Sequence, residues 1–257
     1  MGRVRRRLTW LGQAGFRVEI GGTVAVIDPW VSPHEDRLIP PPPLELAADG
    51  VHVLLVTHEH LDHLDLPFLP QLLERSPDAR VVVPSAIAAD VDGVVPESRL
   101  VLVDPHDVVE VEGLEVRVTP SFHGVTFDDA YGDGSAVGGR PRFVGYALGA
   151  GRRIYHAGDT IVTDQLTDAL EHLDVEVALL PINGRDAERE ARGIIGNMDA
   201  AEAVQLTLAI GASTLVPYHW DGFAGNTVEP DLAVEAADAR IDVVVPEHFR
   251  TVELEIG

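Results

Sequence analysis

Residues 57–63, which read THEHLDH, hold an unusual density of side chains that can bind metal. Three imidazoles and a carboxylate, His58, His60, Asp62 and His63, fall within six residues. Imidazole and carboxylate are ligands for zinc, iron or manganese, and a short loop can turn them toward one or two ions. Without a metal, these groups would have to satisfy one another's buried polar atoms, which is costly. We therefore interpret this segment as a metal site.

The metal-binding segment directly follows an apolar run, residues 51–56 (VHVLLV), which is typical of a buried strand. The cluster is therefore expected where a strand opens into a loop, which is a rigid position for ligands. Further acidic and imidazole side chains end or follow apolar runs in the same way, namely Asp28, His123, Asp159 and His219. Each of these residues thus closes an apolar run, as the metal-binding segment does.

The spacing His-x-His-x-Asp-His resembles the signature of the metallo-β-lactamase superfamily, and the later landmarks follow in the order expected for that family. The resemblance covers essentially the whole chain. It implies a mixed α/β (α+β) fold of the four-layer αββα sandwich type, whereas periodicity alone predicts only a mixed α/β fold. We expect residues 1–257 to form a single domain of this type.

The resemblance also implies a dinuclear metal centre with two divalent ions, zinc, manganese or iron. The ligands would be His58, His60 and His123 for one ion and Asp62, His63 and His219 for the other, with Asp159 bridging. Such ions lie about 3.5–4 Å apart and hold a water that loses its proton near neutral pH. Asp62 would orient this nucleophile and Asp159 would join the ions, so both are predicted catalytic residues.

Residues 180–186 (LPINGRD), followed by Gly196-Asn197-Met198, resemble the L-ascorbate-6-phosphate lactonase branch of the superfamily. By this resemblance Asn183, Arg185 and Asn197 would bind substrate, because the planar guanidinium suits a phosphate or carboxylate. Trp220 is a candidate for the pocket wall. Two alternatives stay open: Arg185 could pair with a surface acid, and Trp220 could simply pack.

We predict a metal-dependent hydrolase, a lactonase or esterase that acts on a small anionic sugar-derived substrate through metal-bound hydroxide. The alternative is a metal-dependent phosphodiesterase similar to phospholipase D, since a dinuclear centre also stabilises phosphoryl transfer. A non-catalytic binding protein and a redox di-iron protein are rivals from other classes. The intact ligand set argues against the non-catalytic protein, and no flavin or thiol module accompanies the site to favour the redox one.

The charge balance is strongly acidic, with 42 Asp and Glu against 19 basic residues and a net charge of −23. Nucleic-acid binding draws on clustered Lys and Arg, so we expect no nucleic-acid partner. The absence of cysteine limits a metal site to nitrogen and oxygen donors and fits a reducing cytoplasm. No apolar run is long enough to span a membrane or form a secretory core. We expect a cytoplasmic protein, with a homo-oligomer left open.

The remaining pattern predicts the elements that position these residues. Strands are expected at 8–20, 23–28, 81–83, 100–103, 108–119, 143–155, 175–181, 241–245 and 251–256, with hairpin turns at 21–22, 112–113 and 149–151. Helices are expected at 66–75, 163–173, 199–210 and 230–240. Residues 40–43 (PPPP) should be an extended connection, and the glycine-rich residues 124–142 should form a flap over the site or a passive loop.

Overall fold

The computed structural model describes residues 5–124, 139–191 and 196–254, and its strands form two sheets. The first sheet contains, in chain order, β1 (Arg6–Gly12), β2 (Gly15–Ile20), β3 (Thr23–Ile27), β4 (Val53–Leu55), β5 (Arg80–Pro84), β6 (Leu100–Val103) and β14 (Thr251–Leu254). The second contains β7 (Val108–Val111), β8 (Leu114–Pro120), β9 (Val144–Leu148), β10 (Arg153–His156), β11 (Val175–Pro181), β12 (Thr214–Tyr218) and β13 (Asp242–Val243). Spatially the orders are β14-β1-β2-β3-β4-β5-β6 and β13-β12-β11-β10-β9-β8-β7.

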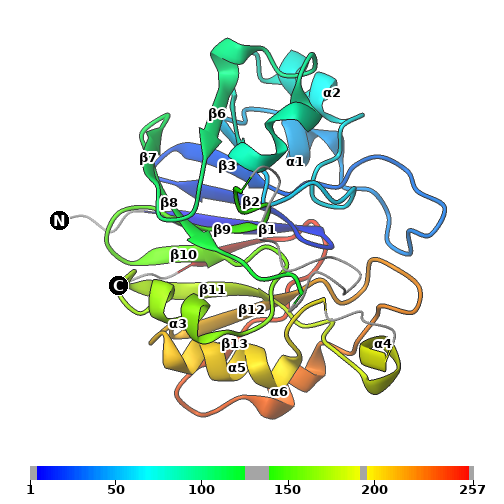
Figure 1. Cartoon of the computed structure of the whole chain (residues 1–257), viewed down its shortest axis with the longest axis vertical. Helices are drawn as coiled ribbons and strands as arrows, with labels where there is room; N and C mark the ends of the chain where they lie inside the picture. The colour runs from blue at the N-terminus through cyan, green and yellow to red at the C-terminus, as the bar shows by residue number, and fades with distance from the viewer. Residues whose placement is uncertain (1–4, 125–138, 192–195, 255–257) are drawn as a thin grey trace.

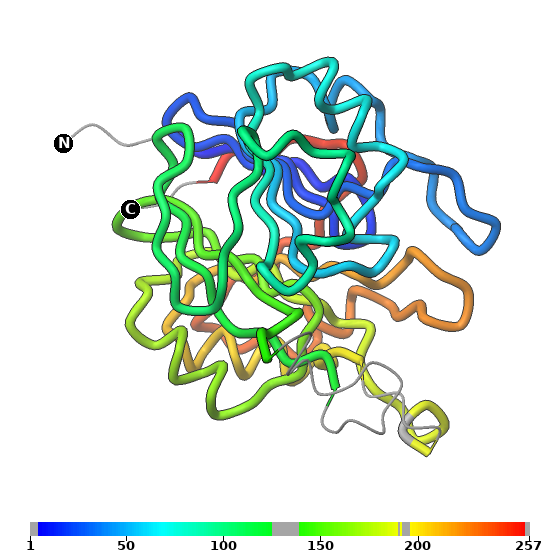
Figure 2. Tube along the Cα trace, turned by 45° about the horizontal axis from the view of Figure 1, so that its top comes forward, coloured from blue at the N-terminus to red at the C-terminus, as the bar shows by residue number. Residues whose placement is uncertain are grey.

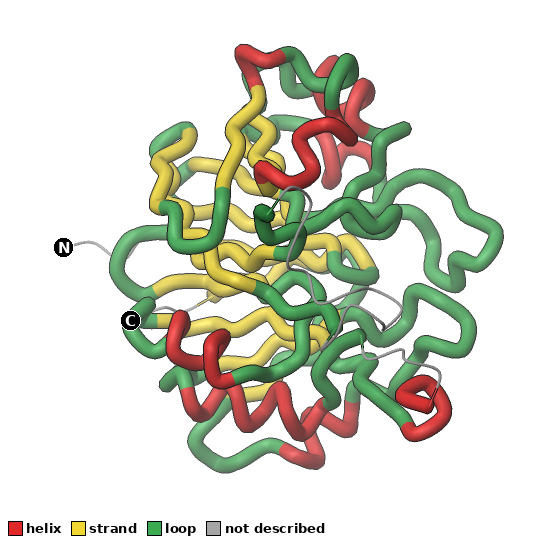
Figure 3. The backbone as a smooth tube through the Cα atoms, viewed as in Figure 1, coloured by secondary structure: helices red, strands yellow, loops and turns green. Residues whose placement is uncertain are grey.

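Short helices cover the outer faces of both sheets (Figure 1; Figure 3). The α-helices are α1 (Leu44–Ala48), α2 (Leu69–Arg75), α3 (Asp164–Leu170), α4 (Ala187–Ala191), α5 (Ala200–Ala209) and α6 (Asp231–Ala236). Two 3-10 helices, η1 (Ser85–Val91) and η2 (Glu97–Arg99), flank β5 and β6. None of the helices in the described ranges is long and apolar enough to cross a membrane.

Three hydrophobic clusters define the layers. The central cluster packs the two sheets face to face, with Trp10 and Phe16 from the first sheet against Tyr146 and Tyr218 from the second. A second cluster joins the outer face of the second sheet to α3, α5 and α6. A third joins the outer face of β4 and β5 to α1, α2 and η1. The layer order is therefore α-β-β-α, as expected from the resemblance.

Parallel pairing brings the ends of the functional strands together. In the first sheet β3, β4, β5 and β6 run parallel, and in the second sheet β10, β11, β12 and β13 do so. Buried residues fill both faces of the central strands β4, β5, β11 and β12, which is why these strands read as continuous apolar runs. Loops that follow the carboxyl ends of such strands meet at one edge, where open α/β sheets commonly bind ligands.

The predicted strand over 8–20 is wrong, because the chain reverses within it. β1 and β2 form an antiparallel hairpin in which Gly12 pairs with Gly15, and Gln13 turns the chain with φ 51°. Residues with a positive φ in turns are usually Gly or Asn, so the glutamine at this position did not indicate a turn. The turns at 21–22 and 112–113 are confirmed, since they connect Ile20 to Thr23 and Val111 to Leu114.

The helices are shorter than predicted, although their positions hold. The helix expected at 66–75 begins at Leu69, because Asp65 accepts the backbone N–H of Phe68 and forms a turn before the helix. The helix start at Asp199 is confirmed as a capping box with Glu202. Most of the glycine-rich segment 124–142, predicted as a flap or loop, lies outside the described residues.

Candidate metal centre

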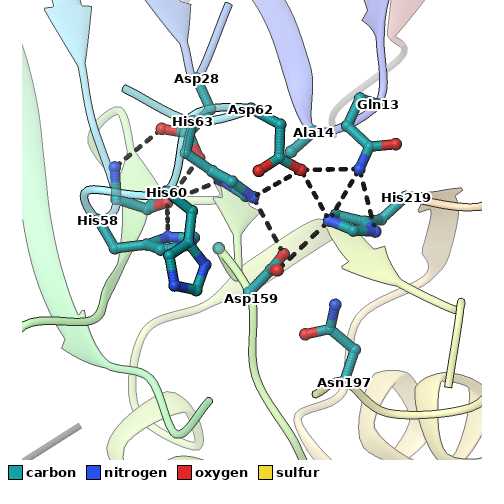
Figure 4. Close-up of polar contacts among 12 residues, drawn as sticks. Gln13, Ala14, Asp28, His58, His60, Asp62, His63, Asp159, Asn197 and His219 are labelled. Atoms are coloured by element: carbon teal, nitrogen blue, oxygen red, sulfur yellow. Dashed lines mark hydrogen bonds and ion pairs between the residues drawn. The ribbon is translucent and has the colours of Figure 1, made fainter. Parts of the chain in front are cut away.

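The predicted ligands meet at one end of the sheet sandwich, on loops that follow β4, β8, β10 and β12 (Figure 4). They form two groups, and within each group the candidate ligand atoms lie within 4.8 Å of one another. One group contains His58, His60, His123 and Asp159, and the other contains Asp62, His63 and His219. The structure therefore brings all seven sequence-predicted metal residues together in the predicted division.

Asp159 lies between the two groups. Its Oδ1 is 3.3 Å from Nε2 of His63, and its Oδ2 is 3.4 Å from Nε2 of His123 and 3.3 Å from Nε2 of His219. Both carboxylate oxygens thus face imidazole nitrogens of different groups. Asp159 therefore contacts histidines of both groups.

Asp28 fixes the orientation of His63 from behind. The fully buried carboxylate accepts the backbone N–H of Thr57 at 2.8 Å and its hydroxyl at 2.6 Å, and it lies 2.7 Å from Nδ1 of His63. This contact leaves Nε2 of His63 directed at Asp159 and Asp62. A carboxylate that holds the far nitrogen of a histidine is a common support for a metal ligand.

Gln13 supports the second group, and the sequence reasoning missed it. Its side chain donates from Nε2 to Oδ2 of Asp62 at 2.8 Å and lies 3.0 Å from Nε2 of His219. Its backbone carbonyl accepts the N–H of His219 at 3.2 Å. The side chain of Gln13 packs against Gly222, and only glycine leaves room for it there, because an added Cβ would lie 1.9 Å from Oε1 of Gln13. The available signal was a polar residue, flanked by glycine, inside an otherwise apolar strand pattern.

The backbone before Asp159 is fixed by close packing. Gly158 has φ 62°, and an added Cβ would lie 2.7 Å from the carbonyl oxygen of Val144. Its N–H donates to Nδ1 of His156 at 3.1 Å, while Nε2 of His156 bonds the carbonyl of Ala14 at 2.8 Å. His156 therefore supports the site through the backbone.

Burial and neighbouring charges separate the histidines into two electrostatic classes. Burial lowers the pKa of His58 well below its ordinary value and that of His60 to about 4, with neighbouring imidazoles adding to the effect. Burial also opposes the charged form of His219, but the carboxylates of Asp159 and Asp62 overcome it and raise its pKa to about 9. The pKa of His63 is raised well above normal by Asp159, Asp62 and Asp28 against the same burial.

Two buried polar atoms at the centre, Nε2 of His63 and Oδ1 of Asp159, form an ion pair with each other at 3.3 Å but make no hydrogen bond of good geometry among the described residues. Buried polar atoms are normally satisfied, so such atoms point to a missing ion or water. The donors are all nitrogen and oxygen, which suits zinc, manganese or iron. The side chains present therefore fit a metal centre.

A cavity of about 420 Å³ opens directly over the ligands. His60, Asp62, His123, Asp159 and His219 form its floor together with Leu61, and Asn183, Arg189, Gly196, Asn197, Phe223, Ala224, Gly225 and Asn226 complete its lining. Of the predicted substrate residues, Asn183 and Asn197 thus face this cavity. Arg189 is the one residue with a permanent positive charge in this described lining.

The other two predicted substrate residues lie elsewhere. Arg185 lines a neighbouring cavity of about 570 Å³ and lies 3.4 Å from Glu202, so it sits beside the metal cavity rather than in it. Trp220 packs against Trp10, with ring centroids 5.0 Å apart. Helix α4 carries Arg189, four residues after Arg185, to the lining of the metal cavity.

A family model described as "Beta-lactamase superfamily domain" matches residues 23–220 of this chain. A UPF0173 metal-dependent hydrolase from Methanopyrus kandleri is 33% identical over 247 residues, which cover 94% of this chain and 96% of that protein. The chain belongs to the UPF0173 metal-dependent hydrolases. In this UPF0173 protein, the matched region includes all seven candidate ligands.

Solved structures agree with this fold assignment. The metallo hydrolase Igni18 from Ignicoccus hospitalis superposes with a TM-score of 0.76 at 23% identity, covering 98% of the UPF0173 chain and 100% of the other. An isothiocyanate hydrolase from Delia radicum gut bacteria superposes with a TM-score of 0.73 at 19% identity, covering 96% and 98%. At these identities the likeness shows the fold alone.

Proposed function

We propose that this metal-dependent hydrolase binds two divalent ions and opens a lactone or similar ester of a small anionic substrate. The observation that carries the proposal is Asp159, whose two oxygens face imidazoles of both ligand groups on the floor of the cavity. His58, His60 and His123 would hold one ion, and Asp62, His63 and His219 the other. When bound, such ions lower the pKa of a shared water and polarise a carbonyl oxygen.

The chain's own residues would position the reactants. Asp62 lines the cavity, and its carboxylate is held by Gln13, so it can orient an attacking water. Asn183 and Asn197 line the same cavity and would orient the substrate. Holding the water and the substrate next to each other converts a bimolecular reaction into an effectively unimolecular one.

Arg189 supports an anionic substrate. The chain carries a net charge of −23, so a carboxylate or phosphate ester meets mostly repulsive charge at its surface. Within the cavity, Arg189 offers a positive charge on a side chain that is only 21% exposed. A partly buried guanidinium binds carboxylates and phosphates more strongly than an exposed one.

The test is a substrate panel on protein reconstituted separately with zinc, manganese and iron(II). We expect turnover of lactones that carry a carboxylate or phosphate, and at least a hundredfold loss in His58→Ala. Turnover of bis-p-nitrophenyl phosphate without lactone hydrolysis would instead establish the phosphodiesterase. Full lactone activity in His58→Ala would contradict the proposed mechanism.

A further inference from the structure

Four polar side chains form a continuous hydrogen-bonded row on the wall of the metal cavity. Arg189 donates from Nη1 to Oδ1 of Asn226 at 2.6 Å, and Nδ2 of Asn183 donates to the same oxygen at 2.9 Å. Nδ2 of Asn197 in turn donates to Oδ1 of Asn183 at 2.9 Å. All four residues line the cavity, so the row connects the cation to the substrate space.

The direction of every bond in this row follows from the guanidinium. Arginine can only donate, so the Asn226 atom that it contacts must be the amide oxygen. The Asn183 atom on that oxygen must then be its NH₂ group, which turns the carbonyl of Asn183 toward Asn197. The Asn197 atom on that carbonyl must likewise be an NH₂ group. The side-chain oxygen of Asn197 is therefore left as the end of the row.

Arg189 is itself firmly held, so it can impose this direction. Its Nη2 donates to the backbone carbonyl of Asn183 at 2.8 Å, and its Nε pairs with Asp186. Asp186 also accepts the backbone N–H of Arg189 at 2.8 Å. These contacts fix the guanidinium relative to the backbone on which the row is built.

The terminal oxygen of the row has no partner. Asn197 is 1% exposed, and its Oδ1 makes no hydrogen bond among the described residues. In Figure 4 its side chain lies beside Asp159 and His219. A buried acceptor without a donor costs about 1–3 kcal/mol. A bound ligand that supplies a donor would recover this energy.

We infer that Asn197 Oδ1 accepts a hydrogen bond from a hydroxyl or N–H group of the substrate, and that Arg189 sets this preference through Asn226 and Asn183. The inference deepens the proposed function and rests on it for the location of the substrate. It narrows the substrate class to lactones or esters that carry a hydroxyl or N–H donor near the ring, because an anionic oxygen beside this carbonyl would be repelled. The substrate's anionic group must therefore lie away from Asn197.

The test compares γ-butyrolactone with its 2,3-dihydroxy derivative on the metal-loaded protein. We expect kcat/KM to favour the dihydroxy lactone by at least about tenfold, since one satisfied buried acceptor is worth 1–3 kcal/mol. Asn197→Leu, which keeps the volume and removes the acceptor, should bring this ratio toward one. Arg189→Met should also lower the ratio, because the amides can then reverse. Arg240→Met, which removes an exposed arginine that pairs with Asp238, serves as the matched control and should keep the wild-type ratio.

A second readout separates this inference from the proposed function. Calorimetry measures the binding of 2-pyrrolidinone and its dihydroxy derivative, which test recognition without ring opening. If neither lactone reacts but the lactam preference depends on Asn197 and Arg189, the lactonase proposal fails and the inference stands. If both lactones react and the wild type shows no preference in either assay, the inference is overturned. Equal losses on both lactones in the variants, with the ratio unchanged, would also overturn it.

Discussion

At the residue scale, the metal ligands could be predicted because their chemistry is visible in their type and spacing. The density of imidazoles in residues 58–63 predicts metal ligands, and the structure places His58 and His60 in one ligand group and His63 in the other. Gln13 could not be predicted in this way, since an amide is not a typical ligand and its contacts arise from a hairpin turn. The sequence alone does not show that Arg189 lines the metal cavity and Arg185 the neighbouring one, because one-dimensional spacing does not reveal which side chains of a segment point to a given cavity.

Gln13 yields a prediction on metal affinity. In Gln13→Leu, Asp62 and His219 lose a fixed polar neighbour, and loss of such support typically weakens metal binding 10- to 100-fold. We expect a weaker Kd for one of the two ions in a chelator competition, with the other unchanged. Gln205→Leu, on the exposed face of α5, is the matched control. If the Kd of each ion is the same in Gln13→Leu as in the wild type, Gln13 does not support the metal site.

At the element scale, strand ends and tight turns carry the site. The sequence pattern located nearly every strand because buried parallel strands are continuous apolar runs. It failed where the chain reverses at Gln13 without a turn-forming residue in the usual place, so that β1 and β2 were merged. The sequence predicts longer helices than the structure has, because the hydrophobic periodicity continues beyond the last hydrogen-bonded turn of each helix.

The close approach of the backbone at Gly158 to a neighbouring strand can be tested by substitution. Its φ is 62° and an added Cβ would lie 2.7 Å from a backbone oxygen, whereas Gly211 has φ 72° and open space around it. Both alanine variants carry the backbone strain of about 1–2 kcal/mol, but only Gly158→Ala adds a clash beside Asp159. In urea unfolding, we expect Gly158→Ala to lose more stability than Gly211→Ala. Only Gly158→Ala should also lose metal binding. Identical behaviour of the two variants would contradict this packing argument.

The capping box of α5 gives a prediction on the free energy of unfolding that does not involve the metal centre. Asp199 accepts the N–H of Glu202 at 2.8 Å, and the Glu202 side chain accepts the N–H of Asp199 at 3.0 Å. Asp199→Ala should lower the free energy of unfolding by about 0.5–2 kcal/mol. Asp231→Ala at the start of α6, where no side-chain cap is formed, should cost less. Urea denaturation of the three proteins measures the difference.

At the scale of the whole molecule, the site makes stability depend on pH when metal is absent. The folded pKa of His60, about 4, lies below the ordinary 6.5, so the folded state binds fewer protons than the unfolded state and loses stability as pH falls below 6.5. The folded pKa of His219, about 9, lies above it, so its contribution is complete below 6.5 and is lost as pH rises toward 9.

The metal-free protein should therefore be most stable near pH 6.5, with a falling Tm on both sides. Metal should flatten the alkaline limb, because binding requires neutral His219 and becomes more favourable as its proton leaves. Thermal unfolding from pH 4 to 9, with and without zinc, measures both effects. A Tm of the metal-free protein that rises steadily to pH 9 would contradict the charge arrangement around His219.

The metal content of the purified protein tests the central claim most directly. Plasma mass spectrometry after purification without chelator, and again after reconstitution with zinc, manganese or iron(II), counts ions per chain. The arrangement of two ligand groups around Asp159 predicts two ions for the wild type and one or none for Asp159→Ala, which should also lose hydrolysis. A wild-type chain that takes up no metal after reconstitution would contradict the account of the site as a dinuclear hydrolytic centre.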